Sequence, residues 1–303
     1  MKGIITPMAT PLLNDDTINK DGLRKLINHL INGGVSGIFI LGTTGEATSL
    51  SNKIKQELVS LSCEYINGRV PLLVGITDPS LAESVQLTIF SKNAGASAVV
   101  AAPPYYFTLT QPELLAYYNK LADQSSLPVY IYNMPAQTKI MIEPATIVTL
   151  SQHPNIPGIK DSSGAGPYFN TLLYLLKDNP DFSIFVGPDE MMAQSVLLGG
   201  SGGVNSGSNM FPELYVQLYN AAAEGDLTTV RRLQQAVMEI SSVIYSQGGG
   251  GYRFLKGIKK VLSILDITDN TMALPLHHMF SDDEAEAIRI SVERVKQILS
   301  NNS

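Results

Sequence analysis

One repeated pattern constrains the fold of this 303-residue chain more than any other feature of its sequence. A short run of apolar residues ends in Gly, Thr, Asn, Pro or Asp, and a longer stretch with helical signals follows. The runs are almost continuously apolar rather than alternating, which is typical of parallel strands covered on both faces. We therefore predict eight strands, at residues 3–8, 37–41, 71–76, 97–101, 128–132, 157–160, 182–186 and 202–205.

Helix signals separate these runs. Capping residues such as the glycine pair Gly33-Gly34, and first-turn prolines such as Pro112 and Pro144, mark helix ends and starts. The predicted helices cover residues 21–32, 51–66, 81–93, 111–124, 143–151, 167–178, 190–198 and 212–224.

The spacing of the strands indicates how they assemble. The second to sixth runs end near 41, 76, 101, 132 and 160, in steps of 35, 25, 31 and 28 residues, and one βα unit takes about 30 residues. Eight such units closing on themselves give an α/β fold of the (β/α)8 TIM barrel type. An open doubly wound sheet is the alternative, but no Gly-x-Gly-x-x-Gly turn follows the first run.

The strand pattern stops near residue 225. Residues 226–245, 252–265 and 282–299 are predicted as helices, so the chain divides into a barrel with the active site, 1–224, and a C-terminal helical extension, 225–303. A run of four glycines at 248–251 joins the first two of these helices. We interpret it as a flexible connector, with a phosphate-binding loop as the alternative.

Charge and composition exclude several classes of partner. Charged residues make up only 16% of the chain, against roughly 25% in an average soluble protein, which indicates either surface buried in oligomer contacts or long apolar elements hidden inside the fold. The net charge of −6 argues against nucleic acid and anionic membranes as partners. The N-terminal residues do not resemble a signal peptide, and no apolar run continues for membrane length.

The inventory of cysteine and histidine argues against metal and disulfide chemistry. The single cysteine, Cys63, cannot form an internal disulfide and fits the reducing cytoplasm. His29, His153, His277 and His278 show no ligand spacing, so we expect no metal site.

Two side chains at strand ends can carry chemistry, because barrel active sites lie at the carboxyl ends of the strands. Lys160 closes the sixth run, where burial disfavours the charged ammonium and leaves a nucleophilic amine suited to Schiff-base formation. The alternative is a rim lysine paired with Asp161. Tyr132 closes the fifth run and can exchange protons with a neighbouring amine, or it can be a core aromatic residue with a satisfied hydroxyl.

Four further segments follow strand ends. The turn 42–46 offers backbone N–H groups that can hold a carboxylate, or it caps the next helix. Two tyrosines after two prolines, at 103–106, form an aromatic corner for packing or for a partner subunit. Asp189 and Glu190 can bind sugar hydroxyls or cap a helix. Small residues at 199–203 and 205–208 flank the last run and leave room for substrate or phosphate.

Four motifs occur in order at these strand ends: GTTGE at 42–46, PPYY at 103–106, YNMP at 132–135 and GIKDSSG at 158–164. This set resembles the dihydrodipicolinate synthase/N-acetylneuraminate lyase family of class I, pyruvate-dependent aldolases, from Gly3 to at least Asn209. The resemblance implies an imine at Lys160, proton relay by Tyr132 and Thr43, and no metal or organic cofactor.

The resemblance also implies the substrate contacts and the assembly. It suggests that Thr43 and Thr44 hold the pyruvyl carboxylate. It also suggests that Tyr106 enters the site of a neighbouring subunit, as in a dimer of dimers. The full set of expected substrate-binding positions is Gly42, Thr43, Thr44, Gln137, Gly187, Asp189, Glu190, Val204 and Asn205.

One position departs from the synthase members. They carry an arginine two residues after the proline of the YN-x-P turn, where it holds a substrate carboxylate. Here Gln137 stands at that place, and an amide cannot supply a charged, bidentate fork. Asp189 and Glu190 resemble the pair that the sialic-acid lyase branch uses against polyhydroxylated substrates.

These observations favour a lyase that cleaves or forms a 2-keto-3-deoxy sugar acid, or a sialic-acid-like substrate, with pyruvate and an aldehyde as the other side of the reaction. The alternatives are a 4-hydroxy-tetrahydrodipicolinate (dihydrodipicolinate) synthase, which condenses pyruvate with aspartate semialdehyde, and a dehydratase of 2-keto-3-deoxy sugar acids. A non-catalytic, oxo-acid-binding regulatory barrel is the alternative outside enzymes.

Overall fold

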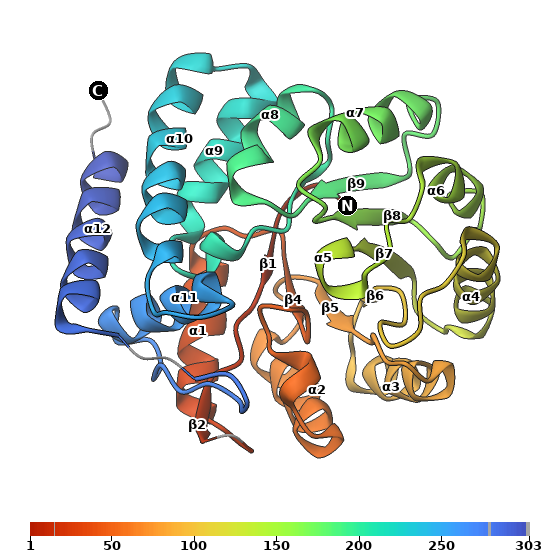
Figure 1. Ribbon diagram of the computed structural model, residues 1–303, viewed down its shortest axis with the longest axis horizontal. Coiled ribbons are helices and arrows are strands. Elements are labelled where there is room, and N and C mark those ends of the chain that lie inside the picture. The colour runs from red at the N-terminus through yellow and green to blue at the C-terminus, as the bar shows by residue number, and fades with distance from the viewer. Residues whose placement is uncertain (15, 278–279, 301–303) are drawn as a thin grey trace.

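Parallel strands close into a barrel at the centre of the molecule (Figure 1), for which the computed structural model describes residues 1–14, 16–277 and 280–300. The barrel joins each strand to the next along the chain, and the last strand pairs with the first. Its described strands are β1 (Gly3–Pro7), β4 (Gly37–Ile40), β5 (Leu72–Gly75), β6 (Ala98–Ala101), β7 (Val129–Asn133), β8 (Gly158–Asp161), β9 (Ser183–Val186) and β10 (Gly202–Gly203). The predicted (β/α)8 barrel is confirmed.

Helices form the outer layer and cover the barrel strands. They are α1 (Lys20–Asn32), α2 (Asn52–Ile66), α3 (Leu81–Ala94), α4 (Gln111–Gln124), α6 (Pro144–Leu150), α7 (Gly166–Leu175), α8 (Met192–Leu197) and α9 (Pro212–Glu224). Local capping sets their starts: Asn19 accepts from the backbone N–H of Gly22 before α1, and Thr110 and Glu113 form a capping box on α4. Such caps satisfy helix N–H groups that lack a partner within the helix.

The sequence analysis does not predict two elements of the fold, because each is very short. The first is a hairpin of β2 (Leu12–Asn14) and β3 (Thr17–Ile18), and the second is the single turn α5 (Pro135–Thr138) after β7. Elements of this length show too few residues for a helical or strand periodicity to emerge.

The barrel interior is a separate apolar layer. Its side chains come from successive strands and include Ile5, Phe39, Leu73, Val100 and Phe185. Because side chains alternate between the two faces of a strand, the other half of each strand packs outward against the helices. The parallel register places Lys160 of β8 opposite Tyr132 of β7 and Phe185 of β9.

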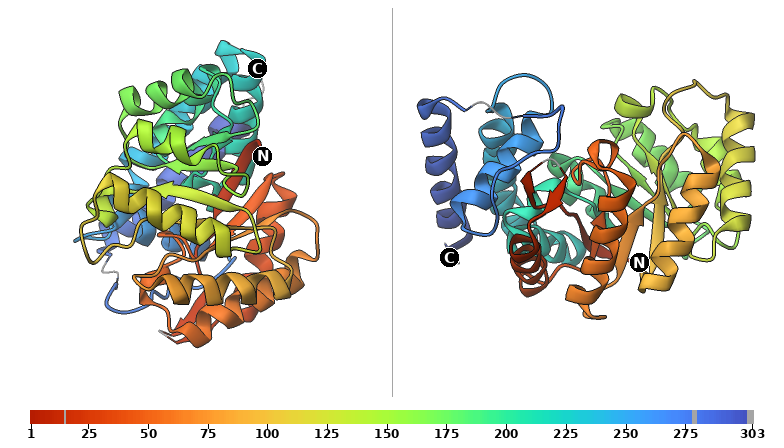
Figure 2. Two further views of the ribbon diagram at one scale, coloured as in Figure 1. Left: turned by 90° about the vertical axis from the view of Figure 1, so that its right-hand side faces the viewer. Right: turned by 90° about the horizontal axis from the view of Figure 1, so that it is seen from below.

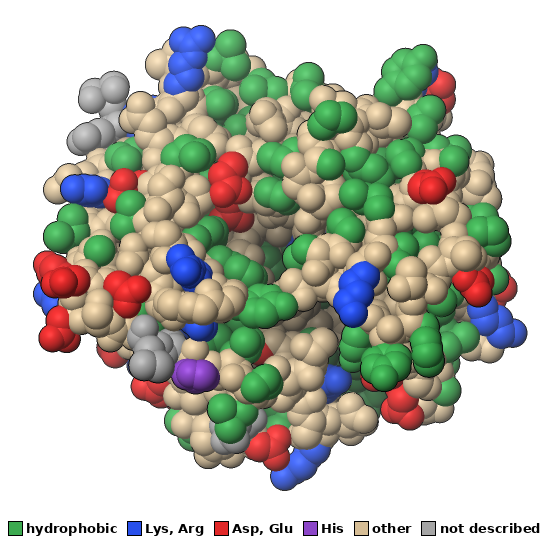
Figure 3. All heavy atoms as spheres, in the orientation of Figure 1, with side chains coloured by type: hydrophobic (Ala, Val, Ile, Leu, Met, Phe, Trp, Pro, Cys, Tyr) green, Lys and Arg blue, Asp and Glu red, His purple; other side chains and the backbone are tan. Residues whose placement is uncertain are grey.

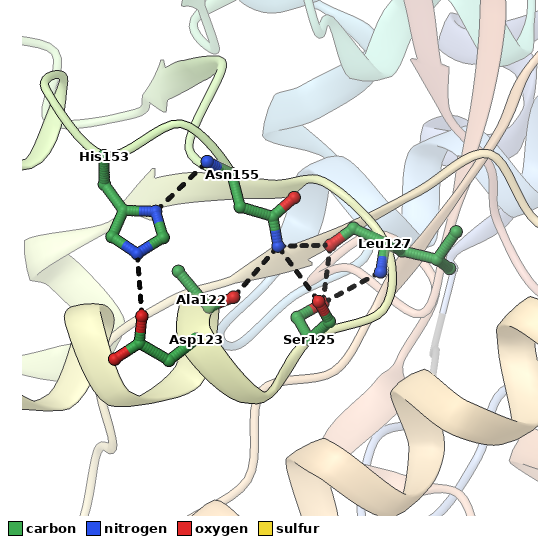
Figure 4. A network of polar contacts seen from close by, with 6 residues as sticks. All are labelled: Ala122, Asp123, Ser125, Leu127, His153 and Asn155. Carbon is green, nitrogen blue, oxygen red and sulfur yellow. Dashed lines mark hydrogen bonds and ion pairs between the residues drawn. The ribbon is translucent and has the colours of Figure 1, made fainter.

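An amide network ties the loops at the other end of the barrel (Figure 4). Asn155 donates from Nδ2 to the carbonyls of Ala122, Ser125 and Leu127, at 3.0, 3.1 and 3.2 Å. His153 contacts Asp123 in the same network, at 3.2 Å from Nε2 to Oδ1. These contacts join the end of α4 to the loops that lead into β7 and β8, far from the strands' carboxyl ends.

The C-terminal extension is helical, as predicted, and consists in the described residues of α10 (Leu227–Ser242), the turn η4 (Ile244–Ser246), α11 (Arg253–Ile264) and α12 (Asp282–Ser300). Helix α10 packs on α9 and α12, and α12 stands at the side of the molecule away from the barrel (Figure 2). Helix α11 reaches the barrel mouth, where it contacts the turn η3 (Ser206–Asn209) that follows β10. No helix in the described ranges is long and apolar enough to cross a membrane.

Candidate active site

Lys160 lies inside the barrel at the carboxyl end of β8. Its side chain is only 8% exposed. Nζ lies 4.4 Å from the centre of the Tyr132 ring and 5.5 Å from that of Phe39. Aromatic faces attract a cation without neutralising it, and Lys160 makes no ion pair with any described residue.

The alternative of a rim lysine paired with Asp161 does not match the structure. Asp161 is the next residue along β8 and therefore points to the opposite face. Its carboxylate accepts hydrogen bonds from Asn133 Nδ2 at 2.8 Å and from the backbone N–H and hydroxyl of Ser163. Burial raises the pKa of Asp161, and the hydrogen bonds from Asn133 and Ser163 oppose that shift. Asp161 thus positions the loop after β8 and leaves Lys160 free.

Tyr132 and Thr43 form a hydroxyl pair beside this amine. Tyr132 Oη and Thr43 Oγ1 are 3.2 Å apart, and the Tyr132 ring meets Phe39 edge to face. Tyr132 comes from β7, the neighbouring strand, and Thr43 from the turn after β4. A pair of hydroxyls in contact can pass a proton in either direction.

One hydrogen bond within the turn at 42–46 and one contact with Ser206 fix its conformation. Glu46 N–H donates to the Thr43 carbonyl at 3.1 Å, and Thr44 Oγ1 contacts Ser206 Oγ at 2.9 Å. A Cβ at Gly45 would lie 3.0 Å from the backbone nitrogen of Leu41 and 3.2 Å from the carbonyl oxygen of Met8, so a side chain here would crowd the backbone. The N–H groups of Thr43 and Thr44 have no acceptor among the described residues, which leaves them available to a carboxylate.

A cavity of about 420 Å³ opens above these groups. Figure 3 shows a hollow near the centre of this face of the molecule, bordered mainly by hydrophobic and uncharged side chains. The lining residues are Phe39, Leu41, Gly42, Thr43, Glu46, Ala47, Thr48, Ser49, Thr77, Ala102, Tyr105, Tyr132, Met134, Gln137, Thr138, Tyr252, Leu255, Pro275 and Leu276. No lysine or arginine lines the cavity in the described part of the chain. Lys160 and Val204 border a small apolar recess that shares Phe39 with it.

Gln137 lies on the wall of this cavity. Its Oε1 accepts a hydrogen bond from the hydroxyl of Tyr252 at 2.7 Å. Tyr252 precedes α11, so the C-terminal extension supplies part of the wall. The sequence offered no signal for this contact, because the two residues lie 115 positions apart.

Asp189 is not a hydroxyl-binding residue at the cavity, contrary to the prediction. Its Oδ2 accepts from Tyr245 Oη at 2.6 Å, Tyr215 Oη at 2.7 Å and the N–H of Gly207 at 3.0 Å. Burial raises the pKa of Asp189 to about 6, although the two tyrosines oppose the shift. Glu190 is exposed, and it is not among the described residues that line the cavity. Asp189 therefore fastens the loop after β9 to α9 and the extension.

The other expected contacts near β10 have different surroundings. Asn205 is buried, and its Nδ2 donates to the carbonyls of Gly187 and Pro188 at 2.9 and 3.2 Å. Val204, just beyond β10, packs in the barrel interior, whereas the side chain of Asn205 is used in the loop contacts. Gly187 leaves no room for a side chain, since a Cβ would lie 1.9 Å from Ser162 Oγ.

The two tyrosines of the aromatic corner at 103–106 lie in different surroundings. Tyr105 lines the cavity, and burial raises the pKa of its hydroxyl, with a further contribution from Asp78. Tyr106 points away and is 75% exposed, with its ring edge to face against Phe107. The motif at 103–106 indicated a functional corner but could not show which tyrosine belongs to the cavity of its own chain.

The described residues contain no group of three or more histidine, cysteine and acidic side chains that could hold a metal. His278, which the sequence analysis considered, lies outside the described residues. Cys63 is half-buried, and burial raises its pKa.

Comparisons with known proteins agree with this geometry. The model of the dihydrodipicolinate synthetase family matches residues 1–294. The chain is 35% identical to a probable 2-dehydro-3-deoxy-D-pentonate aldolase, YjhH, of Escherichia coli K12, over 80% of this chain and 81% of that protein.

Two solved structures cover nearly all of the chain. A dihydrodipicolinate synthase of Bacteroides thetaiotaomicron is 50% identical, with a TM-score of 0.93 and coverage of 97% of this chain and 98% of that one. YagE of E. coli K12, solved in complex with pyruvate, is 27% identical, with a TM-score of 0.92 and coverage of 98% and 99%. The chain therefore belongs to the dihydrodipicolinate synthetase family, whose members are pyruvate-dependent class I aldolases that act as lyases or synthases.

Proposed function

We propose that this enzyme cleaves, or in reverse forms, a 2-keto-3-deoxy sugar acid, with pyruvate and a hydroxylated aldehyde as the other side of the reaction. The observation that carries this proposal is the lining of the cavity beyond Tyr132. Hydroxyls, aromatic rings and the amide of Gln137 surround the space where the aldehyde part would lie. Neutral hydroxyls and amides suit a polyhydroxylated chain, whereas a second carboxylate needs a cation.

The alternative remains a 4-hydroxy-tetrahydrodipicolinate synthase. It is favoured by the name of the 50% identical structure from B. thetaiotaomicron. The name of YjhH favours a deoxy sugar acid instead. Gln137 distinguishes the two, because aspartate semialdehyde carries a carboxylate that Gln137 cannot bind through two charged hydrogen bonds. Dehydration of a sugar acid on the same imine is a third reaction that the cavity would accommodate.

In the proposed mechanism Lys160 is the nucleophile. Its neutral amine attacks C2 of the keto acid, and the resulting carbinolamine loses water to give an iminium ion. The buried surroundings of Lys160, with the rings of Tyr132 and Phe39 close by, limit the access of water to this carbon.

Tyr132 then exchanges protons with the substrate. Its phenol first gives its proton to the hydroxyl that leaves the carbinolamine as water, and the resulting phenolate then takes the proton of the C4 hydroxyl, with Thr43 as the relay partner at 3.2 Å. The C3–C4 bond breaks, the aldehyde leaves, and the electron pair moves into the iminium to give an enamine. Protonation of that enamine at C3 and hydrolysis of the imine release pyruvate and restore the amine of Lys160.

Thr43 and Thr44 would hold the carboxylate at C1. Their N–H groups lie on the turn after β4, and the Thr44 hydroxyl is fixed by Ser206. Backbone donors held by a rigid turn stabilise an anion without reorganising when it binds. This contact orients C2 of the keto acid toward Lys160.

We also propose that the enzyme works in the cytoplasm as a homo-oligomer, a dimer of dimers. The exposed pair Tyr106 and Phe107 supports an interface near the mouth, because two large aromatic side chains stand in solvent there. In this arrangement Tyr106 would reach the site of a neighbouring copy. Its hydroxyl would join the proton relay of Tyr132 and Thr43.

Borohydride trapping tests the imine. The enzyme is incubated with pyruvate and borohydride, and intact mass is measured for the wild type, Lys160→Ala and Lys139→Ala. Lys139 is exposed at the end of α5, so its variant serves as the control. We expect one reduced pyruvyl group on the wild type and on Lys139→Ala, and none on Lys160→Ala. An adduct that survives in Lys160→Ala would overturn the mechanism.

A substrate panel tests the specificity. Pyruvate release is measured from 2-keto-3-deoxy acids of different length and stereochemistry, and condensation of pyruvate with aspartate semialdehyde is measured in parallel. We expect kcat/KM to be higher for at least one sugar acid than for aspartate semialdehyde. Faster condensation with the semialdehyde would favour the synthase.

A further inference from the structure

A buried ion pair links the turn of Thr43 and Thr44 to the C-terminal extension. It joins Glu46, the last residue of the motif at 42–46, to Lys259 of α11, and the two side chains are 0% and 1% exposed. Lys259 Nζ also donates to the Thr271 carbonyl at 2.6 Å, and Glu46 Oε2 accepts from the N–H of Ala273 at 2.8 Å. Burial lowers the pKa of Lys259, and Glu46 opposes that shift.

The backbone of Glu46 acts directly on the turn. Its N–H donates to the Thr43 carbonyl, and its own carbonyl accepts from the N–H of Ser49 at 2.9 Å. Glu46 has a φ of 56°, in the left-handed region, which a non-glycine residue rarely adopts without support. The contacts of its carboxylate with Lys259 and Ala273 supply that support from outside the turn.

The extension contributes to the cavity at the same place. Leu255, Pro275 and Leu276 line the cavity and flank, in sequence, the residues that hold Glu46. Because buried ion pairs add little net stability compared with apolar side chains of similar size, stability alone is a weak reason for charges here. Because Glu46 is itself the last residue of the turn, the location of the pair indicates a role in the geometry of the turn.

We propose that the Glu46–Lys259 pair positions the carboxylate-binding turn, so that the extension completes the pyruvate site without touching pyruvate. This inference rests on the proposed role of Thr43 and Thr44. In this arrangement the ion pair with Lys259 fixes the Glu46 side chain, and the Glu46 N–H donates to the Thr43 carbonyl. The N–H groups of Thr43 and Thr44 then stay directed at the substrate, and the Thr43 hydroxyl stays within reach of Tyr132.

The test compares Lys259→Met with Lys256→Met. Lys256 is a matched control, because it lies on the same helix and is also buried, but its Nζ donates to the Gly249 carbonyl at 2.7 Å and does not touch the turn. For Lys259→Met we expect the KM for pyruvate to rise about tenfold while kcat at saturating pyruvate falls less, as for two weakened charge-assisted hydrogen bonds. Lys256→Met should keep the wild-type KM.

Hydrogen exchange of the backbone amides of residues 41–50, followed by mass spectrometry, gives a readout independent of activity. We expect faster exchange in Lys259→Met and unchanged exchange in Lys256→Met. An unchanged KM and unchanged exchange in Lys259→Met would overturn the proposal. An equal rise of KM in both variants would overturn it as well, because the cause would then be general loosening of α11.

Two further outcomes also have a defined consequence for the proposal. If Lys259→Met does not fold, the double variant Glu46→Gln/Lys259→Met takes its place, since it leaves no buried charge unpaired. A raised KM and faster exchange in the double variant support the proposal, and wild-type values overturn it. If the wild type forms no pyruvyl adduct, the imine function fails, and the exchange comparison still decides whether the pair holds the turn.

Discussion

The two ends of the cavity are built in different ways. At the inner end, Lys160 and Tyr132 stand on neighbouring barrel strands, so the parallel register of the sheet fixes their relative positions. Thr43 lies beside them on the turn after β4, which the Glu46–Lys259 pair joins to the extension. At the rim, Gln137 comes from a one-turn helix, and Tyr252, Leu255 and Leu276 come from the extension. The lysine and the tyrosine are therefore fixed by the barrel itself, whereas the rim depends throughout on contacts between segments far apart in the chain.

This difference corresponds to two chemical tasks. The imine chemistry is the same for every 2-keto acid and needs groups held at fixed distances. Discrimination between aldehydes needs only a wall whose side chains can change without disturbing the strands. We therefore expect substitutions at the inner end to change kcat, and substitutions at the rim to change which substrate is used.

The largest effect is expected from Tyr132→Phe. Loss of the phenol should lower kcat by about 10²- to 10⁴-fold, the usual contribution of a general acid–base group. Tyr130→Phe is the matched control, because Tyr130 lies on the same strand and faces the same interior one layer deeper. Steady-state kinetics on the best sugar acid would measure both. A loss in Tyr130→Phe as large as in Tyr132→Phe would contradict the assigned relay.

Asp189 tests how the extension is attached to the strand ends. The pKa of Asp189 is about 6 in the folded protein, above its ordinary value of 3.8. Since the folded state then binds the proton more tightly, the contribution of Asp189 to stability falls as the pH rises from 4 to 6. Asp189→Asn does not titrate, so between pH 4 and 7 its stability should change in its favour by roughly 2 kcal/mol relative to the wild type.

Chemical denaturation of both proteins across this pH range measures the difference. Any constant effect of the amide, such as a weaker contact with Tyr215 or Tyr245, cancels in the pH dependence. Parallel curves for Asp189→Asn and the wild type would show that the carboxyl titrates normally in the folded protein.

The same division explains what the sequence could predict. The strands and their order followed from apolar runs about 30 residues apart. Lys160, Tyr132 and the turn at 42–46 were selected from their places at strand ends, and the role of Thr43 was implied by the family resemblance. The rim did not follow, because no local pattern shows that Tyr252 reaches Gln137. Asp189 and Asn205 were misjudged for a third reason: position after a strand end does not tell which way a side chain points, and a one-residue change reverses it.

Gln137→Arg should shift the substrate preference at the rim. A guanidinium in this neutral wall gives a carboxylate two charge-assisted hydrogen bonds. We expect condensation with aspartate semialdehyde to improve about tenfold in kcat/KM, while trapping of pyruvate at Lys160 stays unchanged. Gln137→Met, of similar length and without charge, is the control and should not improve condensation. Strong condensation by the wild type, with little change in Gln137→Arg, would favour the synthase instead.

Tyr252→Phe is expected to have the smallest effect and gives the sharpest comparison. Removing one hydroxyl costs a single neutral hydrogen bond, so the KM for the sugar acid should rise about threefold, and the KM for pyruvate should not change. If the hydroxyl acts by orienting Gln137, Tyr252→Phe should add nothing in a Gln137→Met background, because the hydrogen bond at 2.7 Å is already lost there. Additive effects would mean that the hydroxyl contacts the substrate itself. A parallel rise in the KM for pyruvate would mean that the rim and the inner end are mechanically one unit, and the distinction between rigid chemistry and adaptable recognition would not hold.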